Sequence, residues 1–468
     1  MKTLLIDIQP HFEFQNILND LKLTNIRSIR TKYISFKKSL GDVKLKKFSN
    51  KIHYTYEEIL KFNSTCNIPE DLDRNKIYNY LDKMLSDPKL ISIFERSFFT
   101  TLNNTKRIRL ISILFFQAIN FLKKIKPHAY ILFATPHNIN IHIFKWACFS
   151  LDIDVIYPQE SLLPWRYYIF TEKDNDKYLF NLGDRWNEDD RLQINQFKKK
   201  VRDVNYLAPY VLQNKKKFFT ILGDLKKYWK RPDLIFNKVF IFNFYNKITK
   251  KFKLPKSNYI FFPLHFSPER STLPDGGKYF DQFRALHEIR SKFGKNIKII
   301  VKEHPTTFVD VCHWGERTKH FYNSILNLNN IIFAPINYPT TKLIKNSMCT
   351  IVINSNVAFE GLLLDKNVIY MSDFRFFGPE SKNLYKFKNL NKKKLLSIYS
   401  NLKKKNTFSK NWFEKYTITS KKNTIDFFNS LNSMRSDRSK CYNIMIQKLV
   451  SVYANNEIKK YLKKSNEV

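Results

Sequence analysis

One pattern repeats between residues 259 and 370: an apolar run of strand length, a polar loop, and a helix-length segment. Apolar runs that alternate with helices are typical of a parallel sheet, because parallel strands need a crossover between them. The loops that follow such strands share one edge of the sheet, where ligands bind. We expect strands at 259–264, 297–302, 330–334, 351–353 and 368–370, and helices at 280–293, 320–328, 340–346 and shortly after residue 356.

A second unit of this kind is expected nearer the N-terminus. Residues 129–134 and 152–157 are strand-like and flank an apolar helix at 139–151, which makes a βαβ unit. Polar side chains follow these strands, and they are His137, Glu160 and Ser161. Elsewhere in this half we expect a strand at 3–8 and helical stretches at 12–23, 56–62 and 108–124.

The length of 468 residues exceeds what one core normally serves, so two domains are expected. The first covers 1–250 and ends in a helical, basic connector that begins near residue 173. The second covers 251–385. Residues 386–468 form basic C-terminal helices, and one of them is expected to cross back to the first domain.

The net charge of +40 is unevenly distributed. Residues 191–256 hold 18 Lys/Arg against 3 Asp/Glu, and residues 386–468 hold 20 against 5, whereas 257–385 hold 15 against 11. Positive charge attracts nucleic acid or an anionic membrane. Aromatic residues are interleaved among the lysines near 228–244, a pattern that suits a membrane surface and equally suits a face turned toward a core. Solvated helix faces are the alternative explanation of the uneven charge. The chain shows no nucleic-acid-binding motif, so we expect no nucleic-acid partner.

Cysteine and apolar patterns exclude several classes of protein. The five Cys occur singly, which argues against a zinc module and a disulfide framework. The N-terminal apolar run is too short for a signal peptide, and residues 110–122 fall short of the roughly 20 residues of a spanning helix. We expect a cytoplasmic protein, with a peripheral position on the inner face of the cell membrane as the further option.

Three loops of the second domain carry groups suited to an anionic ligand. Arginine, lysine and histidine meet phosphate charge, and hydroxyls or turn amides donate to its oxygens. A carboxylate one helical turn further along can accept from ribose hydroxyls. The candidates are His265, Glu269, Arg270 and Ser271 in the first loop, Lys302, Glu303 and His304 in the second, and Ser355, Asn356 and Glu360 in the third.

The sequence lacks the motifs of two other classes of phosphate-binding protein. It lacks a Walker loop and a GxGxxG fingerprint, so a P-loop ATPase or a fingerprint-bearing dinucleotide enzyme is not expected. No DxD-like pair follows a strand of the second domain, so we expect no metal and no cofactor. Taken singly, each candidate has a plain structural explanation: His304 can be a strand-end residue and Ser355 a helix cap. Three such loops at successive strand ends favour function.

These motifs resemble the capsule polysaccharide biosynthesis family, which includes Kdo-transferase-like proteins. The resemblance rests on Pro263-Leu264-His265, on Pro268 to Thr272, on Lys302-Glu303-His304-Pro305, and on Asn354-Ser355 with the run Phe359 to Leu364. It covers about 257–375. It implies a GT-B-like α/β fold, with two Rossmann-like domains whose parallel sheets face a cleft.

The resemblance also implies roles. His304 would hold the phosphate of a nucleotide-sugar, a CMP-sugar in related enzymes, Ser355 would bind phosphate and Glu360 ribose. Asn356 stands where members commonly have Gly, and Asn tolerates a positive φ. No acidic motif marks the catalytic base, for which Glu160 is the first choice, followed by Asp7 and Glu269. His137 is expected on the acceptor side.

The predicted function is transfer of a sugar from a nucleotide-activated donor to a surface polysaccharide or glycolipid. Three alternatives stay open: another GT-B enzyme, such as a polyol-phosphate transferase or a nucleotide-sugar epimerase; a non-catalytic partner in polysaccharide assembly or export; and a charge-driven nucleic-acid binder. An epimerase would need no acceptor, and a non-catalytic partner would tolerate loss of His304.

Overall fold

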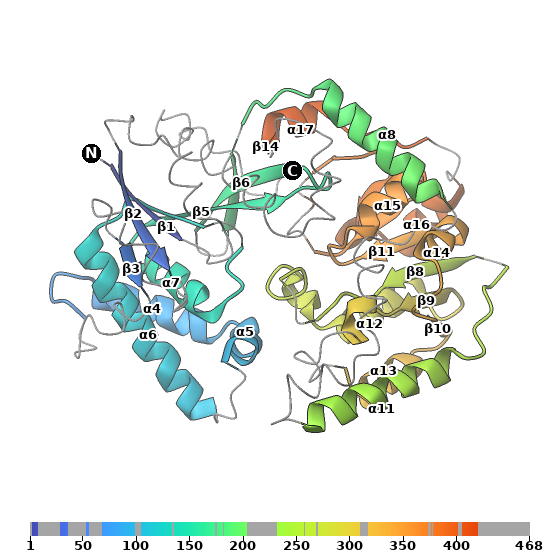
Figure 1. Cartoon of the computed structure of the whole chain (residues 1–468), viewed down its shortest axis with the longest axis horizontal. Helices are drawn as coiled ribbons and strands as arrows, with labels where there is room; N and C mark the ends of the chain where they lie inside the picture. The colour runs from blue at the N-terminus through green and yellow to red at the C-terminus, as the bar shows by residue number, and fades with distance from the viewer. Residues whose placement is uncertain are drawn as a thin grey trace. The chain divides into compact units, whose positions relative to one another are not determined.

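The computed structural model divides by contacts into two units (Figure 1). Unit 1 takes in the described residues up to Trp186 and those from Asn411 onward, and unit 2 is Asn187–Lys410. The described residues are 2–7, 29–35, 53–55, 68–98, 104–132, 135–173, 176–180, 182–203, 232–256, 258–267, 270–308, 317–372, 376, 378–400 and 405–419.

The sheet of unit 2 is parallel throughout. Its order is β10-β9-β8-β11-β12-β13, so the first three strands spread to one side and the next three to the other. This is the doubly wound Rossmann order, and its reversal lies between β8 and β11. The strands are β8 (Tyr259–Pro263), β9 (Lys298–Lys302), β10 (Ile331–Ala334), β11 (Cys349–Val352), β12 (Val368–Tyr370) and β13 (Leu384–Lys386).

Both faces of this sheet are buried. Ile260 and Phe262 of β8 belong to one apolar cluster, and the alternate residues Tyr259 and Phe261 belong to another, because successive side chains of a strand point to opposite faces. Burial on both sides explains why the strands read as continuous apolar runs. The helices of the unit are α8 (Glu188–Arg202), α11 (Pro232–Thr249), α12 (Gln282–Phe293), α13 (Lys319–Leu326), α14 (Thr340–Asn346), α15 (Val357–Leu363) and α16 (Lys392–Ser400).

The sheet of unit 1 begins like that of unit 2 and ends differently. Strands β3-β2-β1-β4-β5 are parallel, and β6, β7 and β14 continue the sheet antiparallel. The strands are β1 (Lys2–Asp7), β2 (Ile29–Ser35), β3 (His53–Thr55), β4 (Ala129–Ile131), β5 (Asp154–Glu160), β6 (Arg166–Lys173), β7 (Asp176–Leu179) and β14 (Thr417–Thr419). Its helices are α4 (Arg74–Leu85), α5 (Lys89–Phe98), α6 (Asn104–Ile125), α7 (Ile139–Ser150) and α17 (Lys410–Tyr416).

The predicted α/β class, a GT-B-like pair of Rossmann-like units built on parallel strands, is confirmed. Two local predictions are wrong. Residues 158–160, expected to follow a strand that ends at Tyr157, belong to β5, where Glu160 pairs with Tyr167 of the antiparallel β6. Residues 176–179 form β7 where a helix was expected.

Contacts divide the chain at a different place from the expected boundary at residue 250. Helix α11 belongs to unit 2 because Tyr245, fully buried, lies in the main apolar cluster of that unit. Within 386–468, α16 belongs to unit 2, whereas residues 411–419 belong to unit 1, where β14 pairs with β6. The helices expected at 12–23 and 56–62, and everything after residue 419, lie outside the described residues.

In the part of the chain that the structure describes, no helix combines the length and the hydropathy needed to cross a bilayer.

Candidate functional site

The polar loops of unit 2 converge on the carboxyl edge of its sheet, as parallel topology requires. His265 follows β8 and Ser355 follows β11, on either side of the strand-order reversal. His304 follows β9, the neighbour of β8. Its ring lies 6.0 Å, centroid to centroid, from that of Phe266 in the first loop. The first two predicted loops therefore meet at this edge.

His304 is a neutral hydrogen-bond donor. The backbone N–H of Thr306 donates to its Nδ1 at 3.3 Å, so the ring proton lies on Nε2. Burial, together with the positive charges of Lys302 and Arg317, lowers the pKa of His304 to about 3. The imidazole thus stays uncharged at neutral pH and presents an Nε2–H.

A buried carboxylate fixes the backbone at this point. Glu303, 1% exposed, accepts from the backbone N–H of His304 at 2.8 Å and from Arg317 Nε at 2.8 Å. The hydroxyls of Thr307 and Tyr322 also donate to it, at 3.2 and 2.8 Å. These four hydrogen bonds offset the desolvation of the carboxylate. Glu303 is therefore a structural residue that sets the position of its neighbour.

Arg317 and Tyr245 join this carboxylate to other strand ends. Arg317 Nη2 donates to the carbonyl of His265 at 2.8 Å, which ties the loop after β8 to the loop after β9. The Tyr245 hydroxyl of α11 donates to the carbonyl of Ala334, the last residue of β10, at 2.7 Å. The same hydroxyl accepts from the backbone N–H of Glu303 at 3.0 Å. The edges of three adjacent strands are held in register by these two side chains.

Lys302 and Glu360 form an unusual charge pair. Lys302 Nζ donates to the carbonyl of Tyr338 and to Thr340 Oγ1, both at 2.8 Å, so it holds the loop between β10 and α14. Burial lowers the pKa of Lys302 to about 8, and the negative charge of Glu360 opposes that change. Burial raises the pKa of Glu360 to about 7, and the ammonium of Lys302 opposes it. Their charges interact, yet no ion pair within 4.0 Å involves Glu360 among the described residues.

The first loop is braced mainly through its backbone. Gln282 of α12 donates to the carbonyl of His265 at 3.1 Å and accepts from its N–H at 2.8 Å. Arg270 Nε lies 3.7 Å from a carboxylate oxygen of the buried Asp275. The hydroxyl of Ser372, after β12, donates to the carbonyl of Asp275 at 2.5 Å. Ser271 is half-buried in the same loop.

The third loop differs from its expected geometry. Asn356 has φ −60°, an ordinary helical value, so the tolerance of Asn for positive φ is not used. Ser355 Oγ accepts from the N–H of Val357 at 3.2 Å in the turn that leads into the seven-residue α15, whose N-cap residue, Asn356, makes no side-chain cap hydrogen bond. Gly361 lets this helix approach β12, since a Cβ there would lie 2.8 Å from Val368 Cγ2. That close approach positions Glu360.

Other predicted residues belong to unit 1. His137 Nδ1 is 2.9 Å from the carbonyl oxygen of Thr135, in the loop before α7. Glu160 is half-buried at the end of β5, and Ser161 turns its hydroxyl onto the backbone of Leu163. Asp7, 1% exposed, ends β1 beside Tyr130. Glu269 lies outside the described residues.

Contacts and charge interactions unite part of the predicted set. Lys302, His304 and Glu360 interact electrostatically, and His265 joins them through Arg317. Ser355, Asn356 and Ser271 lie in the loops at the same edge of the sheet. Sequence reasoning missed Arg317, Tyr245 and Tyr322, because their partners are far away in the chain. Among the described residues, no three His, Cys, Asp or Glu side chains gather as metal ligands do.

The segment that carries the sequence motifs matches a known protein family. Residues 245–399 match the family model described as capsule polysaccharide biosynthesis protein. No curated protein matches the chain.

Several solved structures are similar at low identity. KpsC from Thermosulfurimonas dismutans, a beta Kdo 2,7 transferase, is 12% identical, with 74% of this chain and 96% of that chain covered and a TM-score of 0.31. UDP-GlcNAc 2-epimerase from Methanocaldococcus jannaschii, in complex with UDP-GlcNAc and UDP, is 14% identical, covering 96% and 100%, with a TM-score of 0.28. The Neisseria meningitidis UDP-GlcNAc 2-epimerase bound to UDP-GlcNAc is 12% identical, covering 97% and 99%, with a TM-score of 0.24.

The matched segment contains every described residue of the proposed donor site. The resemblance to the capsule polysaccharide biosynthesis family, predicted from the His-Pro and Asn-Ser motifs, is confirmed over residues 245–399.

Proposed function

We propose that the protein is a glycosyltransferase that moves a sugar from a nucleotide-activated donor to a polysaccharide or lipid-linked acceptor. Unit 2 binds the donor at the carboxyl edge of its sheet, and unit 1 serves the acceptor. The family match supports this proposal, since it spans the strand ends of unit 2 that carry the candidate donor-binding residues. A lipid-linked acceptor places the reaction at the inner face of the cell membrane.

The protonation state of His304 carries the proposal. A ring that is neutral and protonated on Nε2 donates one hydrogen bond to a phosphate oxygen and holds that state across the physiological pH range. Glu303 fixes the backbone of His304, so the donor is preorganised before the ligand arrives. A solvated, titrating histidine would lack both properties.

Glu360 complements this donor as an acceptor. Its carboxylate makes no ion pair within 4.0 Å in the described part of the chain, so its oxygens remain available to ribose hydroxyls. Lys302 is held by Tyr338 and Thr340, and it acts on the ligand through its charge and through the loop that it positions. Arg270, Ser271 and Ser355 supply further donors for the phosphate. CMP is the nucleotide that the His-Pro motif favours.

The proposed reaction is a substitution at the anomeric carbon. A carboxylate base takes the proton of the acceptor hydroxyl, whose oxygen forms the new bond to that carbon. The bond from the carbon to the donor phosphate breaks, and its electron pair leaves on the phosphate oxygen. Glu160 and Glu269 are the proposed bases, with His137 on the acceptor side. Cationic and N–H donors around the phosphate would stabilise the leaving group without a metal ion.

A thermal-shift screen with CMP, CDP, UDP and GDP tests the donor site. A ligand at about one hundred times its Kd stabilises the folded state by about 2.7 kcal/mol. We expect one nucleotide to raise Tm in the wild type, and His304→Ala to abolish most of that rise. His287→Ala, an exposed histidine on α12, is the matched control and should respond like the wild type.

The outcomes separate the alternatives. No response to any of the four nucleotides would sink the donor site. A rise that His304→Ala leaves unchanged would remove His304 from it. Conversion of a nucleotide-sugar to its epimer without an acceptor would replace glycosyl transfer by epimerisation.

A further inference from the structure

Helix α11 carries an exposed stripe that the donor site does not use. Phe236 is 75% exposed, Phe240 55% and Val239 38%, which sets them among the most exposed large apolar side chains described. Asn243, Lys247 and Lys250 continue the stripe at three- and four-residue spacing and are also exposed. The opposite side of the helix is buried, with Ile241 and Tyr245 in the core of unit 2. The helix therefore carries aromatic residues on its exposed side as well as on its buried side.

The surroundings of this stripe are positively charged. Residues 232–256 contain six lysines and one acidic residue, Asp233. Lys247, Lys250, Lys251, Lys253 and Lys256 are all exposed. Helix α13, which packs beside α11, adds Lys319, whose ammonium lies 5.8 Å from the ring centroid of Phe244. No acidic residue occurs in α13. A second copy of this surface would be repelled, whereas an anionic partner would be attracted.

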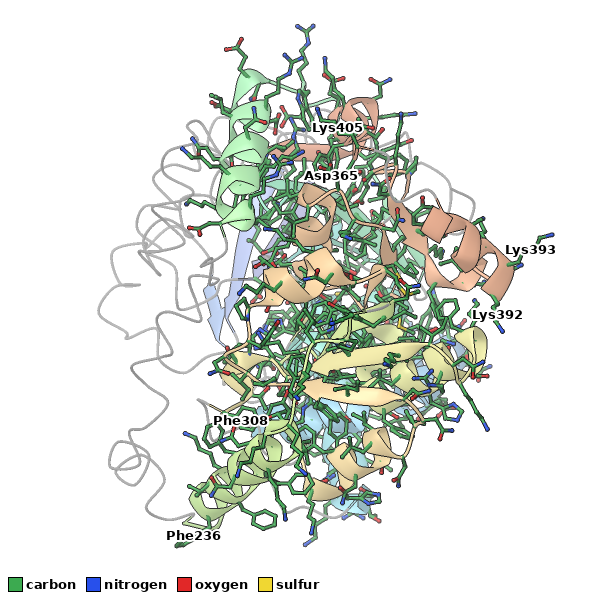
Figure 2. All side chains as sticks on the ribbon, turned by 90° about the vertical axis from the view of Figure 1, so that its right-hand side faces the viewer. Phe236, Phe308, Asp365, Lys392, Lys393 and Lys405 are labelled. Carbon is green, nitrogen blue, oxygen red and sulfur yellow. The ribbon has the colours of Figure 1, made fainter. Side chains whose placement is uncertain are left out.

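The aromatic end of the stripe projects beyond the carboxyl edge of the sheet. Tyr245 reaches the ends of β9 and β10 with its hydroxyl, and the chain then runs on toward the start of β8. One turn earlier in α11, Phe242 packs against Phe308, which lies in the loop that His304 begins, at 5.4 Å between ring centroids. Phe236 and Phe240 lie further out along the same helix. Figure 2 labels Phe236 near the N-terminal end of α11 and Phe308 beside the helix.

We propose that the Phe236–Val239–Phe240 end of α11 inserts into the headgroup region of an anionic phospholipid bilayer, with Lys247, Lys250 and Lys319 on the lipid phosphates. Aromatic rings prefer the membrane–water interface, and juxtaposed lysines add attraction to anionic lipids. The inserted end lies on the side of unit 2 that carries the donor loops. A lipid-linked acceptor would thus meet the protein near the edge that carries His304. The docking surface itself does not depend on the proposed function.

Vesicle co-sedimentation of the full chain tests this surface. We expect binding to phosphatidylcholine vesicles that contain phosphatidylglycerol, little binding to phosphatidylcholine alone, and a loss of affinity as salt rises. Phe236→Ser/Phe240→Ser should weaken binding by at least about 10-fold, given the worth of burying one aromatic side chain. Lys247→Glu/Lys250→Glu should weaken it by roughly 5-fold per lysine removed. Leu192→Ser on α8, a 52% exposed apolar residue, is the matched control and should bind like the wild type.

The results distinguish a lipid bilayer from a second copy of the chain as the partner of this face of α11. Wild-type affinity in Phe236→Ser/Phe240→Ser would overturn the proposal, as would equal binding to both kinds of vesicle. Dimerisation in solution that the same double variant abolishes would assign the face to a second copy instead. Nucleotide-induced Tm shifts should be unchanged in the α11 variants, so failure here and failure of the donor site are distinguishable.

Discussion

The two units order their first parallel strands alike, but they treat buried charge differently. In unit 1, Lys145 of α7 lies 2.9 Å from a carboxylate oxygen of Glu172, and the Tyr157 hydroxyl donates to the other oxygen at 2.6 Å. In unit 2, Lys302 and Glu360 shift each other's pKa at the carboxyl edge without an ion pair within 4.0 Å in the described residues.

This difference separates charges that pair directly within the fold from charges that we propose meet a ligand. A buried pair in direct contact has its desolvation offset within the protein. A buried acid and base whose pKa values both move toward neutrality are less fully compensated, and such groups cluster at functional sites. Unit 2 contains both types, since Glu303 and Arg317 are paired directly a few residues from Lys302.

The largest expected effect concerns the directly paired charges. Arg317→Met leaves the carboxylate of Glu303 buried without its cation, and Glu172→Gln leaves Lys145 without its anion. Each should cost about 3–5 kcal/mol of unfolding free energy. Urea denaturation measures it. Glu288→Ala is the control, because Glu288 forms an exposed network with Lys278 and Arg284 worth about 1 kcal/mol or less.

The double variant Glu303→Gln/Arg317→Met should recover part of the loss, since it removes both charges. If Arg317→Met costs no more than Glu288→Ala, Arg317 does not organise the strand ends, and the contrast between direct and indirect pairs fails.

A smaller effect is expected for nucleotide affinity in Glu360→Gln. The substitution removes the negative charge and one of the two acceptor oxygens, and a hydrogen bond to a charged group is worth about 1.5–3 kcal/mol, or roughly 10- to 150-fold in Kd. Calorimetry with the nucleotide selected by the thermal-shift screen measures it. Glu172→Gln in unit 1, titrated under conditions where it remains folded, should bind with wild-type Kd. Equal losses in the two variants would show that Glu360 acts on the fold and not on the ligand.

The last comparison concerns the pH dependence of stability. The pKa of Glu360 rises from 4.5 to about 7 on folding, so the folded state binds this proton more tightly than the unfolded state. Its contribution to stability is fully present below about pH 4.5 and is lost as pH rises to about 7. Glu360→Gln lacks this loss, so the stability of the variant relative to wild type should increase across that range and stay constant above it.

His304 acts in the opposite direction. Its pKa falls from 6.5 to about 3, so its contribution is present above about pH 6.5 and is lost as pH falls toward 3. Urea denaturation of wild type, Glu360→Gln and His304→Ala at matched pH values separates the two. Parallel curves for wild type and Glu360→Gln would contradict a shifted Glu360.

The elements of unit 2 between residues 259 and 370 could be predicted closely from the sequence. The expected strand 259–264 is β8 at 259–263, the expected 297–302 is β9 at 298–302, and the expected helix 340–346 coincides with α14. Strands buried on both faces read as uninterrupted apolar runs, so their signal is local and strong. The parallel order then fixes which loops share an edge.

The long-range contacts could not be predicted. Glu303 precedes Arg317 by 14 residues, and Tyr245 precedes Glu303 by 58, with no local pattern to connect them. The antiparallel strand β6 was missed because its charged ends and aromatic residues give no clean alternation. The placement of α11 in unit 2 depends on Tyr245 and Ile241, which look like any other apolar positions of a basic helix.

The return of the chain to unit 1 after Lys410 also affects the order in which the two units can fold during synthesis. Unit 2 is one continuous segment that ends at Lys410, whereas the sheet of unit 1 gains its edge strand β14 only when Thr417–Thr419 emerge. Until then β6 lacks β14 along Arg166–Tyr168, and the Arg166 guanidinium lacks the carbonyl of Phe413 and the hydroxyl of Thr417. On the ribosome, the segment made second can therefore finish folding first. A nascent chain released before residue 419 would expose an open strand edge, which is a template for aggregation.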